Sequence, residues 1–310
     1  MGLVQWMLRL TYGVTGLTGL AVALIYLFQE KILYVPKIPG LVDSDPLTPE
    51  RLGLQSEDIS ITTRDGVRLH AWLLGLAPWA QQHRRNRPVI LFFQENAGDM
   101  SFRLPFLRTM MRRLDCPVLA VSYRGYGMSQ GRPNERGLQL DAQAGLDYLL
   151  SRPDLKDRAV VLFGRSLGGA VSTYLAATRQ HQVRALIIEN TFMSVEEMVA
   201  QVLPPLGIVI GPGKLLNFLV TNKWHNRDQL PKITQLPILM LVSSLDEMVP
   251  ASQMYALHAL NRAPHCELVT IQGAHHLDAY EHSPEEYWGA LRNFMLTHVE
   301  SRAAGGVASE

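Results

Sequence analysis

The sequence predicts an α/β fold, a mostly parallel central sheet with helices on both faces, preceded by one transmembrane helix at the N-terminus. Three observations support this prediction. Short apolar runs alternate with stretches of helical periodicity, as expected for strands buried on both faces and joined by helical crossovers. Two earlier runs alternate in polarity and predict an antiparallel hairpin. A long uncharged apolar segment occupies the N-terminus.

The composition is that of a folded protein with a membrane segment. Of the 310 residues 47% are hydrophobic and 18% are charged, below the roughly 25% charged residues of soluble domains. A net charge of +1 gives no reason to expect a nucleic acid partner. Cys116 and Cys266 lie far apart without CxxC spacing, which excludes a disulfide scaffold and a thiolate zinc site. We expect no metal and no cofactor.

Residues 1–32 are expected to form a membrane anchor. Twenty uncharged residues, 10–29, separate Arg9 from Glu30, and a helix of this length covers the roughly 30 Å hydrocarbon core of a bilayer. One alternative is a cleaved signal sequence, although bulky residues at 26–28 occupy the place of a small-residue cleavage site. The other is a buried core helix. We expect a single-pass protein of the endoplasmic reticulum or another endomembrane.

The remaining chain divides by its pattern. Residues 33–54 carry four prolines and are expected to form an extended connector. One folded domain is expected over residues 55–300, and it begins with a hairpin of residues 59–63 and 67–74 around an Asp-Gly turn. Buried strands are expected at residues 89–93, 118–121, 160–163, 185–188, 238–242 and 268–271. The small polar residues 301–310 are expected to form a flexible tail.

The most informative motif is Gly-x-Ser-x-Gly at residues 164–168. It follows an expected strand and opens a helical pattern, which is the context of a nucleophile elbow, a tight turn that exposes its serine above the sheet. The two glycines would provide clearance that a side chain would block. We therefore expect Ser166 to be a nucleophile, with the backbone amide of Leu167 as an oxyanion donor. The alternative is a glycine-rich packing turn.

A serine nucleophile needs a histidine to take its proton and a carboxylate to orient that histidine. Asp246 and His275 follow the last two expected strands, and the chain order Ser, Asp, His is that of α/β hydrolases. Their neighbours Glu247 and His276 are the alternatives. We prefer Asp246 because of its following Met-Val-Pro context, and His275 because it directly follows a Gly-Ala pair.

The loop after the first buried strand adds a family resemblance. It contains Asn-Ala-Gly at residues 96–98, and residues 122–131 read Ser-Tyr-Arg-Gly-Tyr-Gly-Met-Ser-Gln-Gly. The chain, from its N-terminal helix to the expected histidine, resembles membrane-anchored α/β hydrolases related to fungal bud emergence protein 46 and to α/β hydrolase domain-containing protein 13. The resemblance implies an α/β-hydrolase fold with a triad and an oxyanion hole. The triad would be Ser166, Asp246 and His275, and the oxyanion amides those of Asn96 and Leu167.

One position departs from that family, whose members usually carry His-Gly before Asn-Ala-Gly. This chain has Gln94 and Glu95 there. A carboxylate beside the developing negative charge would oppose catalysis, and a non-glycine residue forced to positive φ would cost about 1–2 kcal/mol. An intact oxyanion hole therefore requires that Glu95 points away from it.

Residues 191–230 interrupt the alternation of strands and helices. They are strongly apolar and are broken by prolines and glycines, so we expect a lid insertion. Such a surface could hold an acyl chain or contact a bilayer, and the alternative is a small helical cap that packs on the sheet.

Together these features predict a membrane-anchored serine hydrolase of the carboxylesterase or thioesterase type, which forms an acyl-enzyme. The anchor and the apolar lid favour an ester or thioester of an acyl lipid or an S-acylated protein, by analogy with related branches. The bilayer itself would be the other partner. Two alternatives remain: an amide hydrolase of the aminopeptidase type, and a catalytically silent membrane scaffold, for which Glu95 is the best argument.

Overall fold

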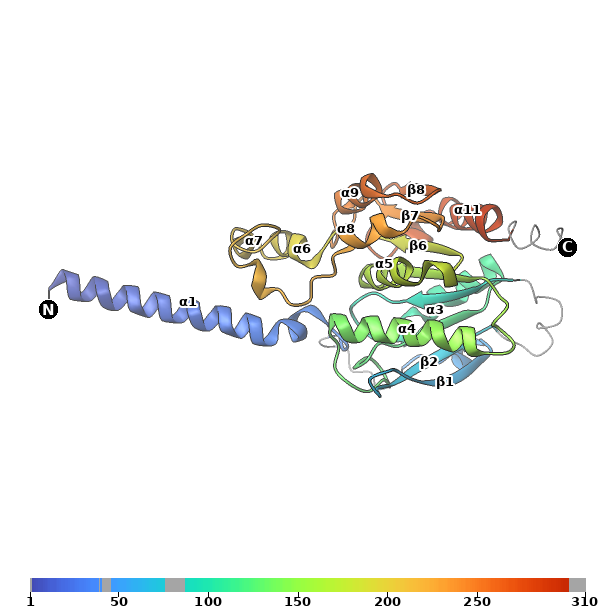
Figure 1. Ribbon diagram of the computed structural model, residues 1–310, viewed down its shortest axis with the longest axis horizontal. Coiled ribbons are helices and arrows are strands. Elements are labelled where there is room, and N and C mark those ends of the chain that lie inside the picture. The colour runs from blue at the N-terminus through green and yellow to red at the C-terminus, as the bar shows by residue number, and fades with distance from the viewer. Residues whose placement is uncertain (1, 39, 41–45, 76–86, 301–310) are drawn as a thin grey trace.

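The computed structural model describes residues 2–38, 40, 46–75 and 87–300. Helix α1 (Leu3–Leu33) extends away from a body in which helices flank a sheet (Figure 1). The expected tail at 301–310 and part of the expected connector lie outside the described residues.

Eight strands form one sheet in the order β1-β2-β4-β3-β5-β6-β7-β8. The first three neighbours in this order, β1, β2 and β4, pair antiparallel, and all other pairs are parallel. This confirms the predicted hairpin and the mostly parallel sheet. The strands are β1 (Ser56–Thr62), β2 (Arg68–Leu74), β3 (Val89–Phe93), β4 (Val118–Val121), β5 (Val160–Arg165), β6 (Ala185–Glu189), β7 (Ile238–Ser243) and β8 (Cys266–Ile271).

Helices cover both faces of the sheet, as predicted. One face packs against α4 (Glu135–Ser151), α5 (Leu167–Arg179) and α9 (Ala251–Leu260), and the other against α3 (Leu104–Leu114) and α11 (Pro284–Phe294). Apart from the helices within residues 191–229, the remaining described helical elements are short: η1 (Glu50–Leu52), η2 (Met100–Arg103), η3 (Gln180–Gln182), η5 (Leu230–Lys232), α10 (Ala279–His282) and the π-helix η6 (Met295–Glu300).

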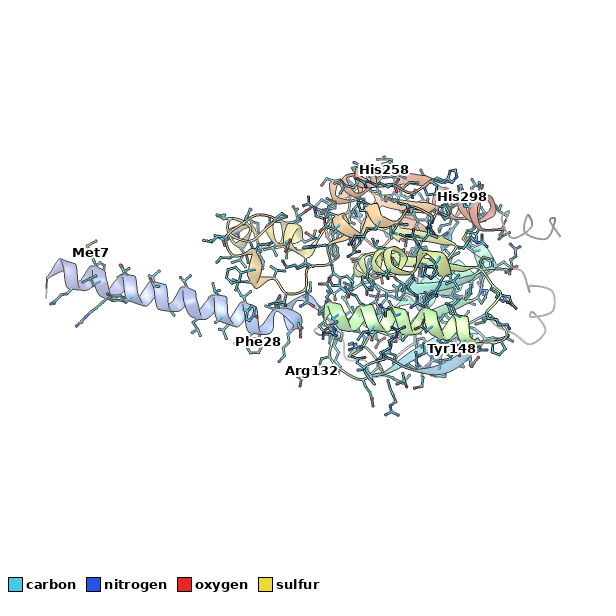
Figure 2. All side chains as sticks on the ribbon, in the orientation of Figure 1. Met7, Phe28, Arg132, Tyr148, His258 and His298 are labelled. Carbon is cyan, nitrogen blue, oxygen red and sulfur yellow. The ribbon has the colours of Figure 1, made fainter. Side chains whose placement is uncertain are left out.

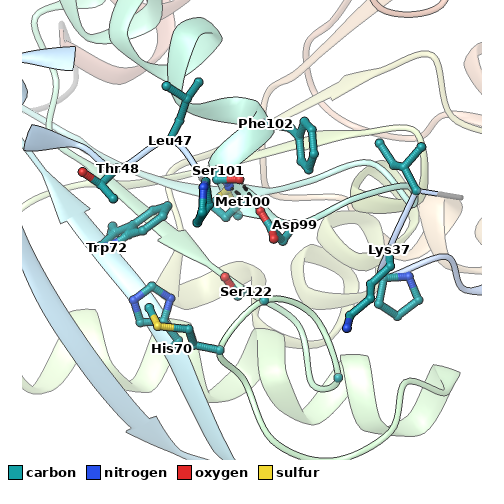
Figure 3. A pocket seen from close by; sticks show the side chains of 16 residues that line it. Lys37, Leu47, Thr48, His70, Trp72, Asp99, Met100, Ser101, Phe102 and Ser122 are labelled. Atoms are coloured by element: carbon teal, nitrogen blue, oxygen red, sulfur yellow. Dashed lines mark hydrogen bonds between the residues drawn. The ribbon is translucent and has the colours of Figure 1, made fainter. Parts of the chain in front are cut away.

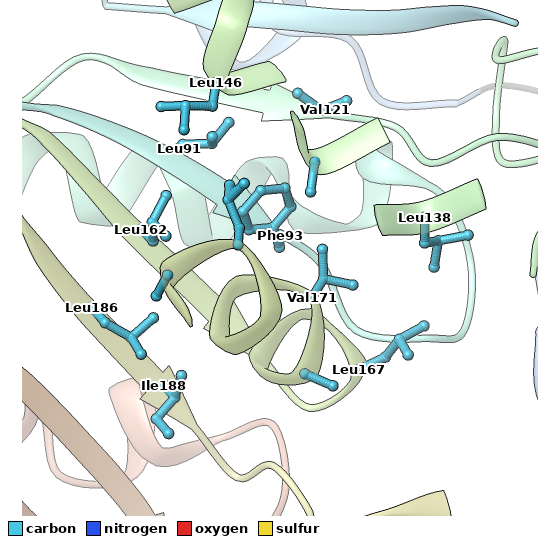
Figure 4. Packing of buried hydrophobic residues seen from close by; sticks show 14 of the residues in the cluster. Leu91, Phe93, Val121, Leu138, Leu146, Leu162, Leu167, Val171, Leu186 and Ile188 are labelled. Carbon is cyan, nitrogen blue, oxygen red and sulfur yellow. The ribbon is translucent and has the colours of Figure 1, made fainter. Parts of the chain in front are cut away.

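Alternating side chains of the central strands supply the two cores. Leu91 and Phe93 of β3 enter the core beneath α5, whereas Ile90 and Phe92 enter the core on the other face, because successive residues of a strand point to opposite faces. Figure 4 shows Val171 of α5 next to Phe93. Burial on both faces explains the nearly continuous apolar runs in the sequence and holds the start of α5 firmly on the sheet.

Most of helix α1 lies apart from the body. Within it, residues Gln5–Leu33 are long and apolar enough to cross a membrane. An 18-residue window of this segment has a mean hydropathy of 1.6, and none of that window is buried. Side chains such as Met7 and Phe28 project outward (Figure 2). One stripe near the C-terminal end differs, because its residues are half-buried: Val22, Ile25, Gln29 and Leu33. This i, i+3, i+7, i+11 spacing places them on one face of the helix.

Residues 191–230 contain several short helical elements and are here called the cap. It contains α6 (Val195–Val202), α7 (Pro204–Gly207), η4 (Asn217–Leu219) and α8 (Asn226–Gln229). Helices α6 and α7 project from the body on the side to which α1 extends (Figure 1). Several large apolar side chains of the cap are exposed, among them Val202, Ile208, Leu215 and Phe218.

Candidate active site

Ser166 lies on a strained turn between β5 and α5. Its φ of 54° and ψ of −117° belong to a region that L-residues rarely occupy and that tends to occur at functional sites. The backbone around it is held from three sides. The Ser166 amide donates to the Glu189 carbonyl at 2.8 Å, and its carbonyl accepts from the Gly169 amide at 2.9 Å and from the Thr191 hydroxyl at 2.8 Å. The side chain itself is partly exposed at the end of the sheet.

The two glycines of the motif permit this turn. A Cβ atom on Gly164 would lie 2.0 Å from the Gly168 carbonyl oxygen, and one on Gly168 would lie 2.0 Å from the Phe93 carbonyl oxygen. Neither contact is possible, so no other residue fits without moving the backbone. This is the clearance expected from the sequence, and it brings α5 directly against the end of β3.

Asp246 and His276 form a buried hydrogen-bonded pair at the same edge of the sheet. Asp246 follows β7 and His276 follows β8, and the His276 Nδ1 atom lies 2.6 Å from the Asp246 Oδ2 atom. The exposed fractions of the two side chains are 1% and 2%. The other Asp246 oxygen accepts the backbone amides of Met248 at 2.9 Å and Val249 at 2.7 Å. A carboxylate held in this way leaves the His276 Nε2 atom as the free proton acceptor.

The expected histidine, His275, is not the partner of Asp246. Its side chain is 54% exposed and contacts Glu247, with Nδ1 3.2 Å from Oε2. Its backbone amide donates to Asp278 at 2.7 Å, which turns the chain after β8. This turn directs the ring of the next residue, His276, inward to Asp246. The prediction that His275 pairs with Asp246 is therefore wrong by one residue, while the choice of Asp246 over Glu247 agrees with the buried pair.

Asn190 is a site residue that the sequence analysis missed. It follows β6 with a φ of 48°, and its side-chain amide donates to the His276 carbonyl and to the Ser243 hydroxyl, both at 2.9 Å. Its side-chain oxygen accepts the Ser243 amide at 2.8 Å. Asn190 thus ties the end of β7 to the loop that carries His276. No motif marks this residue; only its place directly after a predicted strand could have suggested it.

The two expected oxyanion donors lie on elements that meet at the elbow. Leu167 is the first residue of α5, so its amide has no acceptor within its own helix. Asn96 lies in the loop after β3, whose last residue Phe93 pairs with Gly164. The Asn96 side chain donates to the Leu33 carbonyl and accepts from the Tyr126 hydroxyl at 2.9 Å. The roles of the two backbone amides remain predictions.

The Glu95 side chain lies in a buried ion-pair network. Its carboxylate is buried and contacts Arg165 at 3.0 Å and the guanidinium group of Arg103. Burial raises its pKa, but the two positive charges outweigh burial and hold the pKa below the ordinary value. Glu95 is also absent from the described non-glycine residues with positive φ. The strain considered for this position is therefore not present at Glu95, and the two guanidinium groups offset its negative charge.

Arg165 is the centre of that network, another role that the sequence did not indicate. It contacts Glu189 at 3.0 Å as well as Glu95, and its guanidinium lies 4.1 Å from the centre of the Phe106 ring. Tyr287 donates to the second Glu189 oxygen at 2.6 Å. Burial lowers the pKa of Arg165, but the two carboxylates raise it well above its ordinary value. These buried pairs join the ends of β3, β5 and β6 directly behind Ser166.

A cavity of about 540 Å³ lies between the connector and β2 (Figure 3). Lys37, His70, Trp72, Asp99 and Ser122 are among its residues, and none of its residues is Ser166, Asp246 or His276. It is therefore not the space in front of the candidate nucleophile. Within the described part of the chain, no group of three or more His, Cys, Asp or Glu side chains could hold a metal ion.

Comparison with curated proteins gives relatives along the whole chain. A family model described as the alpha/beta hydrolase fold matches residues 97–209. The α/β hydrolase domain-containing protein WAV2 of Arabidopsis thaliana is 43% identical over 97% of this chain and 98% of its own length. Protein bem46 of Schizosaccharomyces pombe is 36% identical, and the match covers 79% of this chain and 81% of bem46. A relative from Saccharomyces cerevisiae, described as an uncharacterized membrane protein, is 27% identical over 92% and 94%.

Solved structures share the fold. An esterase from Pyrococcus furiosus matches with a TM-score of 0.67 at 18% identity, and the match covers 86% of this chain and 97% of the esterase. Est1E from Butyrivibrio proteoclasticus, solved with ferulic acid, matches with a TM-score of 0.59 at 20% identity over 78% and 99%. At these identities the likeness establishes the α/β hydrolase fold alone.

Proposed function

Because this chain belongs to the α/β hydrolase family of WAV2 and bem46, we propose that it is a serine hydrolase that cleaves an ester or thioester through an acyl-enzyme. The observation that carries the proposal is the buried pair of Asp246 and His276 at the sheet edge where Ser166 occupies its strained turn. A strained serine, a buried histidine and a buried carboxylate after three strands of one sheet are the parts of a catalytic triad.

In this mechanism the Ser166 hydroxyl attacks the acyl carbonyl carbon. His276 takes the hydroxyl proton on Nε2 and delivers it to the departing alcohol or thiol, while Asp246 holds the Nδ1 proton and stabilises the imidazolium ion. The amides of Leu167 and Asn96 donate to the oxyanion. Water then attacks the acyl-enzyme with His276 as the base, and Ser166 is released.

The contacts of Glu95 favour an active enzyme over a silent scaffold. The scaffold alternative depended on a carboxylate in the oxyanion loop, and this carboxylate is ion-paired with Arg103 and Arg165. Its negative charge is thereby neutralised locally, so it gives no reason for impaired catalysis. The amide-hydrolase alternative uses the same triad, and no contact of the described residues favours it.

We further propose that α1 is retained as a membrane anchor. Its length and hydropathy support a span, as does the description of the yeast relative as a membrane protein. The Gln29 side chain donates to the Leu219 carbonyl at 3.0 Å and accepts the Thr221 amide at 2.8 Å. A signal sequence destined for removal has no need of such contacts with the cap. A single pass through an endomembrane therefore remains our expectation.

Labelling with a fluorophosphonate tests the hydrolase. The probe reacts with an activated serine and not with an ordinary hydroxyl, so detergent-extracted protein should be labelled and Ser166→Ala should not. Ser151→Ala, at the exposed end of α4, is the control and should be labelled like the wild type. Equal labelling of Ser166→Ala would remove this residue from its role. Matched ester, thioester and anilide substrates then separate the esterase from the amide hydrolase.

Alkaline carbonate washing tests the anchor. An inserted helix of this hydropathy resists extraction, so the full chain should remain in the membrane fraction. Release into the supernatant, or a mature N-terminus near Lys31, would show a cleaved signal sequence.

A further inference from the structure

A second cavity, of about 320 Å³, lies between the anchor helix and the cap. Its wall includes Ile25, Gln29, Ile32 and Leu33 of α1, and the opposite wall comes from residues between Val195 and Asn222. Its volume lies at the lower end of the roughly 300–1,000 Å³ typical of small-molecule sites. Three of the four residues of the half-buried stripe of α1, Ile25, Gln29 and Leu33, line the cavity. The anchor is therefore part of a cavity and not only a tether.

The cavity suits an apolar occupant. Of its described residues all but three are aliphatic or methionine. The three polar side chains, Gln29, Asn96 and Asn222, make hydrogen bonds to the protein. Gln29 binds the backbone of the cap, Asn96 binds the backbone at the end of α1, and the Asn222 oxygen accepts from Tyr34 and from the Glu135 amide. A ligand inside would meet mainly methyl and methylene groups.

The cavity shares one residue with the expected oxyanion hole. Asn96, whose backbone amide is an expected oxyanion donor, contributes to the wall. A short segment also connects the elbow to the other wall: Thr191 is hydrogen-bonded to the Ser166 carbonyl, and it lies four positions before Val195, the first residue of α6. A carbonyl group bound at Ser166 would thus have its acyl chain beside this cavity.

Part of the cavity wall is exposed at the surface of the protein. Val202 and Leu203 of the cap and Ile32 of α1 belong to the cavity and are also largely exposed, with exposed fractions of 64%, 46% and 59%. A neighbouring exposed residue of the cap, Phe218, is apolar as well. Exposed apolar side chains beside a membrane-spanning helix are stabilised by contact with lipid.

We propose that the cavity between α1 and the cap is the acyl-chain subsite, and that the chain enters it from the bilayer. This proposal rests on the proposed function. The occupant is the long-chain acyl group of a membrane-embedded ester or thioester. The Ser166 oxygen forms the new bond to the acyl carbon, the bond from that carbon to the alcohol oxygen or thiol sulfur breaks, and the serine proton passes through His276 to the leaving group. The alkyl chain stays between the two walls throughout.

Chain-length selectivity tests the subsite. Ile25→Trp on α1 and Leu206→Trp on α7 each place a larger side chain in the cavity. Each should lower the ratio of kcat/KM for a twelve-carbon over a four-carbon p-nitrophenyl ester by at least about tenfold, because each buried methylene is worth roughly fourfold in binding. The matched controls point away from the cavity: Leu27→Trp on α1 and Ile208→Trp near α7, with native exposed fractions of 69% and 76%. Both should keep the wild-type ratio.

The result separates this proposal from the proposed function. An unchanged ratio in Ile25→Trp and Leu206→Trp, with fluorophosphonate labelling retained, would overturn the subsite and leave the serine hydrolase intact. A second outcome would also count against the subsite. In it, Ile25→Trp and Leu206→Trp lose hydrolysis of both esters and fluorophosphonate labelling, while Ile25→Val and Leu206→Met keep the wild-type ratio of kcat/KM. No labelling and no ester hydrolysis by the wild type would overturn the hydrolase itself and the subsite with it.

The route of entry is tested with the full chain in phosphatidylcholine vesicles that contain a long-chain ester. For entry from the bilayer, the rate should follow the mole fraction of ester in the membrane and remain constant when the vesicles are diluted with buffer. If the rate falls when the vesicles are diluted with buffer, the long-chain ester enters from water instead. The same conclusion would follow if the rate with a short, water-soluble ester follows its bulk concentration equally well in all wall variants.

Discussion

The His276 imidazole and the Asp246 carboxylate form a fully enclosed polar contact, with Nδ1 2.6 Å from Oδ2 and neither side chain more than 2% exposed. Water cannot compete for this hydrogen bond, and the low local dielectric strengthens it. Asn190 fixes the backbone of His276 and the Ser243 end of β7 at the same time. The orientation of the imidazole is therefore fixed by residues that follow three neighbouring strands, β6, β7 and β8.

The close approach at the elbow makes Gly168 sensitive to a single methyl group. In Gly168→Ala the new Cβ would lie 2.0 Å from the Phe93 carbonyl oxygen, so α5 must move away from the sheet. We expect the free energy of unfolding to fall by about 1–3 kcal/mol or more, with loss of fluorophosphonate labelling.

Gly289→Ala is the matched control for this change. Gly289 lies within α11, and its Cβ would meet nothing within 4 Å. Alanine there should raise the free energy of unfolding by about 0.5–1 kcal/mol. Urea titration in detergent measures both variants, and equal stability of the two would contradict the close contact at the elbow.

The buried pairs of Glu95 predict a pH-dependent stability. Its pKa in the folded protein lies below the ordinary 4.5, so the ionised carboxylate stabilises the fold fully above that value. This contribution is lost as the pH falls through the folded-state pKa. Glu95→Gln leaves Arg103 and Arg165 with one partner fewer and should cost about 3–5 kcal/mol at pH 7.

The difference in the free energy of unfolding between the wild type and Glu95→Gln should shrink steadily below pH 4.5, because protonation removes the same charge from the wild type. Urea titrations at several pH values measure it. Arg112→Gln, an exposed position on α3, is a control that should show little effect at any pH. A difference for Glu95→Gln that does not vary with pH would contradict the ion pairs.

Local patterns were sufficient to predict the strands and the turn at Ser166. Strands buried on both faces require continuous apolar runs, and the elbow requires glycine at positions 164 and 168 because backbone atoms occupy the space of their side chains. These constraints act within a few residues, so they are visible in the sequence. The comparisons confirm the α/β hydrolase fold that these patterns and the family resemblance predicted.

Features that depend on the three-dimensional path could not be read in this way. His275 and His276 are adjacent, and only the turn made by Asp278 decides which ring faces Asp246. Glu95 and Arg165 are 70 positions apart, so the sequence did not show that Arg165 offsets the charge of Glu95. Glu95 was therefore an argument for an impaired oxyanion hole. The contacts of Gln29 with the cap are likewise long-range.

The junction between the anchor and the body predicts two different truncation outcomes. Tyr34 is buried, and its hydroxyl donates to Asn222 and accepts from the Trp224 indole, both at 3.0 Å. Deletion of residues 2–20 leaves this junction intact and should preserve the thermal midpoint and fluorophosphonate labelling. Deletion of residues 2–35 removes it, and we expect stability to fall by about 3–5 kcal/mol, as for loss of a large buried aromatic side chain.

Thermal unfolding followed by circular dichroism compares the two truncations in the same detergent. Tyr34→Phe in the full chain isolates the hydrogen bonds, since it leaves the Trp224 N–H group without its acceptor, and should cost about 1–3 kcal/mol. Equal midpoints for both truncations would show that the anchor is attached only as a tether.

The central claim is that His276, held by Asp246, activates Ser166. The most direct measurement is kcat for a short-chain p-nitrophenyl ester in four proteins: wild type, His276→Ala, His275→Ala and the double variant Ser166→Ala/His276→Ala. We expect His276→Ala to lower kcat by roughly 10⁴–10⁶-fold and the double variant to lose little more, because the triad acts as a unit. His275→Ala, at a side chain that is 54% exposed, should stay within about threefold of the wild type. A large loss in His275→Ala with a small one in His276→Ala would contradict the account.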